Sequence, residues 1–255
     1  MAKIISIHSF RGGTGKSNTT ANIAVMLAAQ GQRVAVIDTD IQSPGIHVIF
    51  GLEGKNITSS LNDYLWRQAN IEDVALDVTP SSLAGLSDIA TGKVFLVPSS
   101  TQAGEITRIL REGYNAEQLT QGLRQLTQRL ELDTLIIDTH PGLNQETLLS
   151  LVISHTLLIV MRPDQQDYEG TSITVKVARE LAVPEMLLIV NKASPRLEPE
   201  AVRRNVAQSY GCPVVAVLPH TDAMMDLASG GIFAVRYPEH SMTEQYRHIA
   251  AQLSS

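Results

Sequence analysis

Residues 8–20 read His-Ser-Phe-Arg-Gly-Gly-Thr-Gly-Lys-Ser-Asn-Thr-Thr, and they lie between an apolar run at 4–7 and a helical run at 18–30. Ile23, Ala24, Leu27 and Ala28 fall on one face of the helical run. A glycine-rich turn between a strand and a helix start is typical of a phosphate site. Glycine lets the backbone turn sharply, and the free N–H groups of the first helical turn point at the anion. We therefore expect a phosphate group to bind after the first strand.

The loop departs from the usual phosphate-loop pattern at its start. That pattern has glycine five places before the Gly-Lys pair, and Phe10 occupies this place. The residues fit a variant, basic-Gly-Gly-x-Gly-Lys-Ser, in which Arg11 is the basic residue. Lys16 is expected to reach the β- and γ-phosphates, and the Ser17 hydroxyl to ligate Mg²⁺. A glycine turn with a chance lysine is the competing interpretation, which the flanking strand and helix disfavour.

The composition suits an α/β protein with a sizeable core, because 44% of its 255 residues are apolar and its mean hydropathy is near zero. The net charge of −6 makes nucleic acid or an anionic membrane a poor default partner without a local basic patch. A single cysteine, Cys212, excludes an internal disulfide and fits a reducing cytosol. The sequence shows no signal peptide, and its longest apolar stretch, 148–161, is too short to span a bilayer. We expect a cytoplasmic protein.

Seven apolar runs rich in Val, Ile and Leu predict parallel strands that are covered on both faces. They lie at 4–7, 34–37, 94–97, 134–137, 157–161, 187–190 and 214–218, with helical stretches at 17–30, 115–130, 166–182 and 198–209. This alternation predicts an α/β fold, a doubly wound, mostly parallel sheet flanked by helices on both faces. We expect a single domain over 1–255 with a less regular insertion at about 52–102. The insertion would hold short helical pieces at 59–67 and 71–75 and a loop through 79–93.

Acidic residues follow two of the expected strands, at the sheet edge where the glycine-rich loop also lies. Asp38-Thr39-Asp40 follows strand 34–37, and Asp138-Thr139-His140-Pro141-Gly142 follows strand 134–137. A Mg²⁺–phosphate site needs oxygen ligands and an acid that orients water. Each aspartate alone is better explained as a turn or cap residue, but three of them downstream of a phosphate loop favour the site. His140 is interpreted as a solvent-facing or structural turn residue.

Taken together, these motifs resemble the MinD/ParA-type ATPases, P-loop NTPases with a deviant phosphate loop. The likeness covers nearly the whole chain: the loop 11–17, Asp38-x-Asp40 as a first switch, Asp138…Pro141-Gly142 as a second, and strand ends at 190–192 and 217–219. The resemblance implies the P-loop NTPase fold, with ATP or ADP and Mg²⁺ as cofactors. It also implies that the phosphates are wrapped by Gly12, Gly13, Thr14, Gly15, Lys16, Ser17 and Asn18.

The same resemblance implies roles around the metal ion and the attacking water. Ser17 would bind Mg²⁺, and Asp38 and Asp138 would support the water shell of the ion. Asp40 would position the hydrolytic water, and Lys16 would act on the phosphates during the reaction.

Arg11 stands where the family carries its signature lysine, which reaches across a dimer to the nucleotide of the partner. An arginine there could act in trans with its planar fork of donors, or fail to fit and leave weaker hydrolysis or an altered dimer. The resemblance places Asn191 and the backbone near Pro219 around the adenine. Residues 191–194 begin like the guanine-binding Asn-Lys-x-Asp pattern but lack its Asp, which favours adenine.

The expected function is that of an ATPase which dimerises around ATP·Mg²⁺, hydrolyses it slowly, and positions or segregates a cargo with an activating partner or cargo adaptor protein. The alternatives are an ATP-dependent dimerising module with little or no hydrolysis, and a metal or cofactor insertase NTPase. The single cysteine disfavours an iron–sulfur relative, and the scattered histidines disfavour metal insertion.

DNA and a membrane are the two surfaces on which a protein of this kind could act. Non-specific DNA is a candidate partner through the arginine pairs at 203/204, 108/111 and 124/129, although each pair is better explained as a solvated helix face. A membrane is disfavoured, because the C-terminal segment 244–255 is short and barely basic. We expect that segment to pack onto the sheet through its apolar face.

Overall fold

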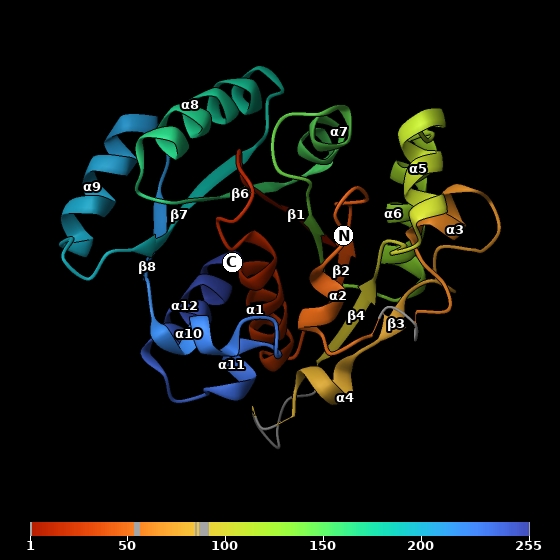
Figure 1. The fold of residues 1–255 in the computed structure, drawn as a ribbon, viewed down its shortest axis with the longest axis horizontal. Coiled ribbons are helices and arrows are strands. Elements are labelled where there is room, and N and C mark those ends of the chain that lie inside the picture. The colour runs from red at the N-terminus through yellow and green to blue at the C-terminus, as the bar shows by residue number, and fades with distance from the viewer. Residues whose placement is uncertain (1, 54–56, 85, 87–91, 255) are drawn as a thin grey trace.

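Each of the seven apolar runs forms a strand in the structure, a computed structural model that describes residues 2–53, 57–84, 86 and 92–254 (Figure 1). An eighth strand, β3, lies outside the predicted set, because two residues carry no readable pattern. The strands are β1 (Lys3–His8), β2 (Arg33–Asp38), β3 (Leu76–Asp77), β4 (Lys93–Val97), β5 (Thr134–Asp138), β6 (Thr156–Met161), β7 (Glu185–Ala193) and β8 (Val214–Pro219).

The strands form one sheet in the order β3-β4-β2-β5-β1-β6-β7-β8. β1 lies between β5 and β6 and is parallel to both. β3 pairs antiparallel with β4, with Leu76 opposite Leu96. The predicted fold class, a doubly wound and mostly parallel sheet, is confirmed. Strands β2 to β5 lie on one side of β1 and strands β6 to β8 lie on the other. The carboxyl end of β1 is therefore at a switch point, the kind of place where such sheets bind ligands.

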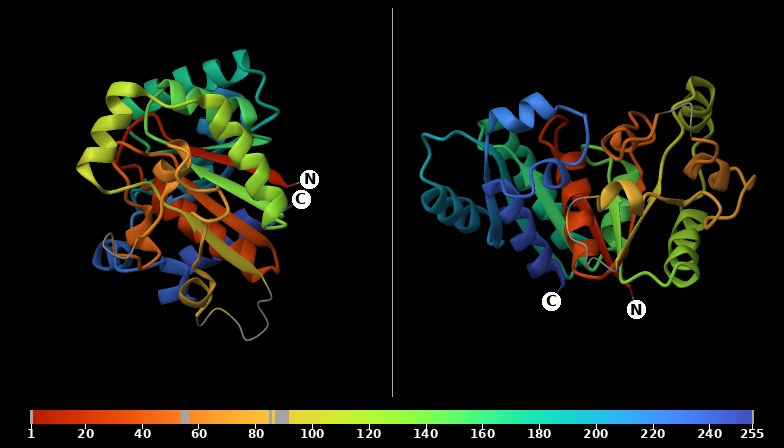
Figure 2. Two further views of the ribbon diagram at one scale, coloured as in Figure 1. Left: turned by 90° about the vertical axis from the view of Figure 1, so that its right-hand side faces the viewer. Right: turned by 90° about the horizontal axis from the view of Figure 1, so that it is seen from below.

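Helices cover both faces of the sheet, as Figures 1 and 2 show, and the four predicted helical stretches are confirmed as α1, α6, α8 and α9. One face carries α1 (Lys16–Ala29), α2 (Ile46–Ile49), α4 (Thr79–Ser82), α10 (Asp222–Leu227), α11 (Phe233–Arg236) and α12 (Ser241–Ser254). The other face carries α3 (Leu61–Leu65), α5 (Ala103–Glu112), α6 (Ala116–Arg129), α7 (Gln145–Ile153), α8 (Gln165–Glu180) and α9 (Pro199–Tyr210).

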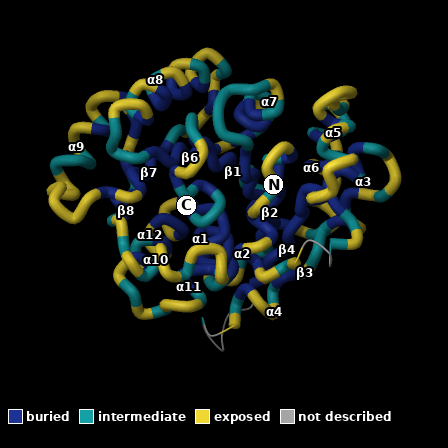
Figure 3. The backbone as a smooth tube through the Cα atoms, viewed as in Figure 1, coloured by how far each residue is buried: buried dark blue, intermediate teal, exposed yellow. Residues whose placement is uncertain are grey.

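The strands bury side chains on both faces, because helices lie against each face. In β2, Val36 packs toward α1 while Ile37 packs toward α6, and both are fully buried. Figure 3 shows the strands and α1 as the buried centre and the outer helices as the exposed shell. α12 packs over α1 and against β8, with Tyr246 and Leu253 buried. The C-terminal segment therefore packs into the molecule, as expected.

The segment at 52–102 differs from the prediction in detail. Its first helical piece is α3, which begins after Ser60, whose N–H donates to Asp63 Oδ2 at 2.7 Å. The helical piece at 71–75 is wrong, because residues 71–74 form turns before β3 starts at Leu76. So short a piece cannot make enough backbone hydrogen bonds to hold a helix by itself. The predicted loop at 79–93 contains α4, and its residues 85 and 87–91 lie outside the described residues.

Candidate functional site

The glycine-rich loop leaves β1 at His8 and enters α1 at Lys16, as the sequence predicts. Gly13 and Gly15 have φ values of +78° and +91°, in the left-handed region that favours glycine. Gly15 also has no room for a side chain, because a Cβ there would lie 2.4 Å from Asn191 Nδ2. No side chain hydrogen bond caps the start of α1, so its first N–H groups remain available to an anion.

Lys16 and Asp138 form a buried ion pair where α1 meets the end of β5. Lys16 Nζ donates to Asp138 Oδ1 at 2.8 Å, and Thr20 Oγ1 donates to the same oxygen at 2.9 Å. The side chains of Lys16 and Asp138 are 7% and 1% exposed. A buried ammonium group needs an anionic partner, and Asp138 provides it here. A phosphate group brought to the loop could take the place of that carboxylate.

Asp38 lies beside Asp138, because the two residues are paired in the register of β2 and β5. Burial, and then the neighbouring charge of Asp138, raises the pKa of Asp38 well above its usual range. Oδ2 of each aspartate is buried without a hydrogen-bond partner among the described residues, and so are Thr14 Oγ1 on the loop and Asn18 Oδ1 in the first turn of α1. Buried polar atoms are normally satisfied. A hydrated cation and a phosphate would satisfy this set, so the residues fit Mg²⁺ and a nucleotide.

Asp40 and His140 contact each other, two residues beyond the paired aspartates. His140 Nδ1 lies 2.6 Å from Asp40 Oδ1, and the Ser43 N–H donates to the same oxygen at 3.2 Å. The Asp40 N–H donates to Asp38 Oδ1 at 2.9 Å. The interpretation of His140 as a plain turn residue is therefore incomplete. The missed signal is its equal spacing with Asp40 from two strand ends, which shows a contact only once the strands are known to be neighbours.

A pocket of about 260 Å³ opens beside the loop, at the ends of β7 and β8. Asn191 Nδ2 donates to Thr14 O at 2.8 Å, and Lys192 Nζ donates to Gly13 O at 2.9 Å. The predicted adenine residues Asn191 and Pro219 both line this pocket. Gly15 and Asn18, predicted to contact the phosphates, line it too. The sequence analysis missed the wall that α10 and α12 form, because these helices carry no motif. The residues that it missed include Met224, Met225, Met242 and Tyr246.

Arg11 points toward the start of α8 and is 39% exposed. Its Nη1 lies 3.8 Å from Asp164 Oδ1 and 3.6 Å from Asp167 Oδ1. Phe10 packs on the backbone of Gly170, where a Cβ would lie 2.1 Å from the ring. The start of the loop is therefore anchored to α8, and Arg11 is held within its own chain.

His8, the last residue of β1, is buried behind the loop. Its Nδ1 lies 2.8 Å from Thr139 Oγ1. Burial lowers the pKa of His8 to about 3, with smaller contributions from the charges of Lys16 and His140. The imidazole is therefore neutral in the folded protein near pH 7.

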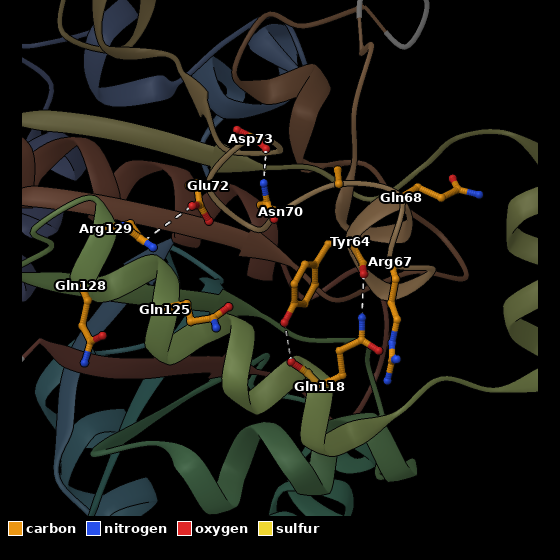
Figure 4. Close-up of a pocket in the computed structure, with 11 residues that line it drawn as sticks. Tyr64, Arg67, Gln68, Asn70, Glu72, Asp73, Gln118, Gln125, Gln128 and Arg129 are labelled. Atoms are coloured by element: carbon orange, nitrogen blue, oxygen red, sulfur yellow. Dashed lines mark hydrogen bonds and ion pairs between the residues drawn. The ribbon is translucent and has the colours of Figure 1, made fainter.

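A larger cavity of about 830 Å³ lies between the turn after α3 and the helix α6. Figure 4 shows glutamine and charged side chains around it, with Tyr64 hydrogen bonded to Gln118 and Arg129 paired with Glu72. It shares no described lining residue with the pocket beside the loop. Size alone therefore does not identify the functional site, whereas the loop and the acidic residues converge at the ends of β1, β2 and β5.

The family model described as an AAA domain matches residues 2–184 of the chain. An uncharacterised ATP-binding protein of Methanocaldococcus jannaschii is 30% identical over 254 residues, which cover 99% of this chain and 88% of that protein. An iron–sulfur cluster carrier protein of Haemophilus influenzae is 28% identical over 264 residues, which cover 99% of this chain and 66% of that protein.

A solved structure of a septum site-determining protein, MinD complexed with Mg-ADP from Pyrococcus horikoshii OT3, has the same fold. The TM-score is 0.80 at 21% sequence identity, and the match covers 99% of this chain and 96% of that one.

Proposed function

We propose that this chain, which belongs to the AAA-domain family and is a MinD/ParA-type P-loop ATPase, binds ATP·Mg²⁺ and forms a homodimer in the ATP state. It hydrolyses ATP slowly until an activating partner or cargo adaptor protein engages it, and the cycle positions or segregates a cellular cargo. It acts in the cytoplasm as a single domain over 1–255, with the segment at about 52–102 as an insertion.

The observation that supports nucleotide binding best is the buried contact of Lys16 with Asp138. A β- or γ-phosphate would pair with the ammonium group, and this would free Asp138 to join Asp38 beside the metal ion. Ser17 is the side chain that would ligate Mg²⁺ directly. Within the described part of the chain, no three His, Cys, Asp or Glu side chains group as a metal site. Water and phosphate oxygens would therefore make up most of the coordination, as is usual for Mg²⁺, which neutralises phosphate charge.

The position of the nucleotide in this proposal follows from the loop and the adjoining pocket. The adenine would enter the pocket lined by Asn191 and Pro219. MinD from Pyrococcus horikoshii was solved with Mg-ADP, which supports an adenine nucleotide in this fold. The phosphates would lie along Gly12, Gly13, Thr14, Gly15, Lys16, Ser17 and Asn18.

Hydrolysis in this proposal depends on three side chains of this chain. Lys16 stabilises the charge that develops on the phosphate oxygens. Asp40 orients the attacking water, because it lies at the same sheet edge as the loop and outside the buried ion pair. Arg11 reaches the nucleotide of the partner in the dimer, and to do so it must leave Asp164 and Asp167, which hold it in this structure.

The role of Arg11 is tested by sedimentation velocity with a slowly hydrolysed ATP analogue. Arg11→Ala should bind the nucleotide as a monomer with wild-type affinity and yet lose the ATP-dependent dimer. Arg11→Lys should recover the dimer at least in part, because lysine is the residue that the family carries there. The matched control is Arg162→Ala. Arg162 also pairs with Asp164 and Asp167, but it does not belong to the phosphate loop. An Arg11→Ala protein that dimerises like the wild type would exclude the trans role.

Two alternatives are separated from this function by direct assays. A dimerising module without hydrolysis would bind ATP but release no phosphate, alone or with a partner. An insertase NTPase is favoured by the likeness to an iron–sulfur cluster carrier protein. Cys212 of this chain, however, is buried, and burial raises the pKa of its thiol. A preference for GTP over ATP, or retention of a metal cofactor during purification, would support the insertase.

The ion pairs of the candidate arginines bear on whether the dimer binds DNA. Three of the candidate arginines for non-specific DNA are already paired: Arg108 with Glu112, Arg129 with Glu72, and Arg203 with Glu200. Those pairs support solvated helix faces rather than a DNA surface. The helices in the described part of the chain are all too short or too polar to span a bilayer.

A further inference from the structure

The turns that follow β2 and β5 meet at the contact between Asp40 and His140. Two further hydrogen bonds join these segments and tie the second turn to α7. The Thr39 N–H donates to Asp138 O at 2.9 Å, and Thr147 Oγ1 of α7 donates to His140 O at 3.2 Å. The imidazole therefore joins two segments that are far apart in sequence, at the point where each leaves the sheet.

The same turn touches the phosphate loop. The Gly142 N–H donates to Ser9 O at 3.0 Å, and a Cβ on Gly12 would lie 4.0 Å from Pro141 Cγ. The contact between His140 and Asp40 consequently lies beside the place where the terminal phosphate is proposed to bind.

The direction of this hydrogen bond follows from its chemistry. An ionised carboxylate can only accept, so the hydrogen must be on His140 Nδ1. Asp40 Oδ1 then accepts from both the imidazole and the Ser43 N–H, while Oδ2 accepts no hydrogen bond from the described residues. The side chains of Asp40 and His140 are 15% and 22% exposed, so the pair is partly shielded while solvent still reaches it. One carboxylate oxygen is held, and the other is left for water.

We propose that His140 is a positioning residue for ATP hydrolysis, whose Nδ1–H holds the Asp40 carboxylate so that Oδ2 faces the attacking water. The inference rests on the proposed ATPase function. His140 does not touch the reacting atoms and acts through Asp40. Because its backbone is fixed by α7 and its ring by the other turn, it places Asp40 correctly when both turns are in position.

Two substitutions distinguish this role from a contact that merely stabilises the fold. In His140→Asn the amide nitrogen occupies the place of Nδ1 and can still donate to Asp40. In His140→Gln the amide nitrogen reaches the place of Nε2 and cannot. A purely structural role would make the two variants differ in stability, without a matching difference in turnover at saturating ATP.

The kinetic test compares phosphate release by the wild type and the variants with saturating Mg²⁺. We expect His140→Ala to lower kcat about ten- to a hundredfold, because a misplaced water loses most of the benefit of orientation. KM and the affinity for a slowly hydrolysed ATP analogue should stay unchanged. His140→Asn should recover most of kcat, and His140→Gln should not. In an Asp40→Ala background, His140→Ala should cause no further loss.

A second readout does not depend on activity. In the nucleotide-free protein at pH 8, nitrogen-15 spectra of labelled histidine should show His140 with its hydrogen on Nδ1. In Asp40→Ala the hydrogen should move to Nε2, the usual place in a free imidazole. A wild-type ring that carries its hydrogen on Nε2 would overturn the proposal.

Failure of this inference and failure of the proposed function look different. A wild type that hydrolyses ATP, with His140→Ala turning over equally fast, would overturn the positioning role and leave the ATPase intact. A wild type that binds ATP but releases no phosphate, with or without a partner, would overturn the hydrolytic function, and the positioning role with it.

Discussion

Replacing Lys16 with Met should destabilise the nucleotide-free protein, not only weaken nucleotide binding. The substitution keeps most of the aliphatic stem and removes the ammonium group, which leaves Asp138 buried at 1% exposure without its counter-charge. Removing one partner of a buried ion pair costs about 3–5 kcal/mol. Thr20 Oγ1 still donates to the same carboxylate at 2.9 Å, so we expect the lower end, about 3 kcal/mol.

The assay is urea unfolding of both proteins in EDTA without nucleotide. In a thermal melt, a loss of about 3 kcal/mol would lower the Tm of a chain of this size by roughly 6–12 °C. Adding Asp138→Asn to Lys16→Met should restore most of the loss, because a neutral amide needs no counter-charge. The control is Lys192→Met. The amine of Lys192 also donates to the loop, at Gly13 O, but this lysine is exposed. Its effect should stay within about 1 kcal/mol.

Addition of ATP·Mg²⁺ then separates the two roles of Lys16. Wild-type protein at a hundred times its Kd should gain about 2.7 kcal/mol, and Lys16→Met should gain little. A Lys16→Met protein that unfolds at the wild-type urea midpoint in EDTA would refute the reasoning, because the buried pair would then contribute nothing to the fold.

Two further predictions concern residues away from the phosphates. Because the pKa of His8 is lowered to about 3 when folded, unfolded protein takes up a proton below pH 6.5 that folded protein does not, so stability falls as pH drops from 6.5 toward 3. Between pH 6 and 4, the free energy of unfolding of the wild type, measured in urea, should fall by about 1.4 kcal/mol per pH unit more than that of His8→Asn. Parallel pH curves for the two proteins would contradict this. In α6, a Cβ on Gly122 would lie 2.5 Å from the Tyr64 ring, so Gly122→Ala should destabilise by about 1–3 kcal/mol. Gly104→Ala in α5 meets nothing within 4 Å and should stabilise by up to about 1 kcal/mol, and equal melting shifts for the two variants would exclude the clash.

Sequence patterns alone were enough to predict the fold class and the place of the phosphate loop. Both rest on local patterns: apolar runs without alternation, and glycines between a strand and a helix start. Asn191 and Pro219 could be named from resemblance, and the structure brings both to one pocket beside the loop. The helix predicted at 71–75 failed, because a few residues of local pattern do not outweigh turn formation.

Contacts between side chains that are distant in sequence could not be predicted and follow from the packing of the whole fold. Asp38 and Asp138 are a hundred residues apart, and the register of β2 and β5 makes them neighbours. That register also brings His140 to Asp40, and the docking of the loop on α8 sets Arg11 against Asp164 and Asp167. Local sequence contains the period of a strand but not the identity of its neighbours. Strand order, register and helix docking are set by packing across the whole sheet, so contacts between distant residues appear only in the folded chain.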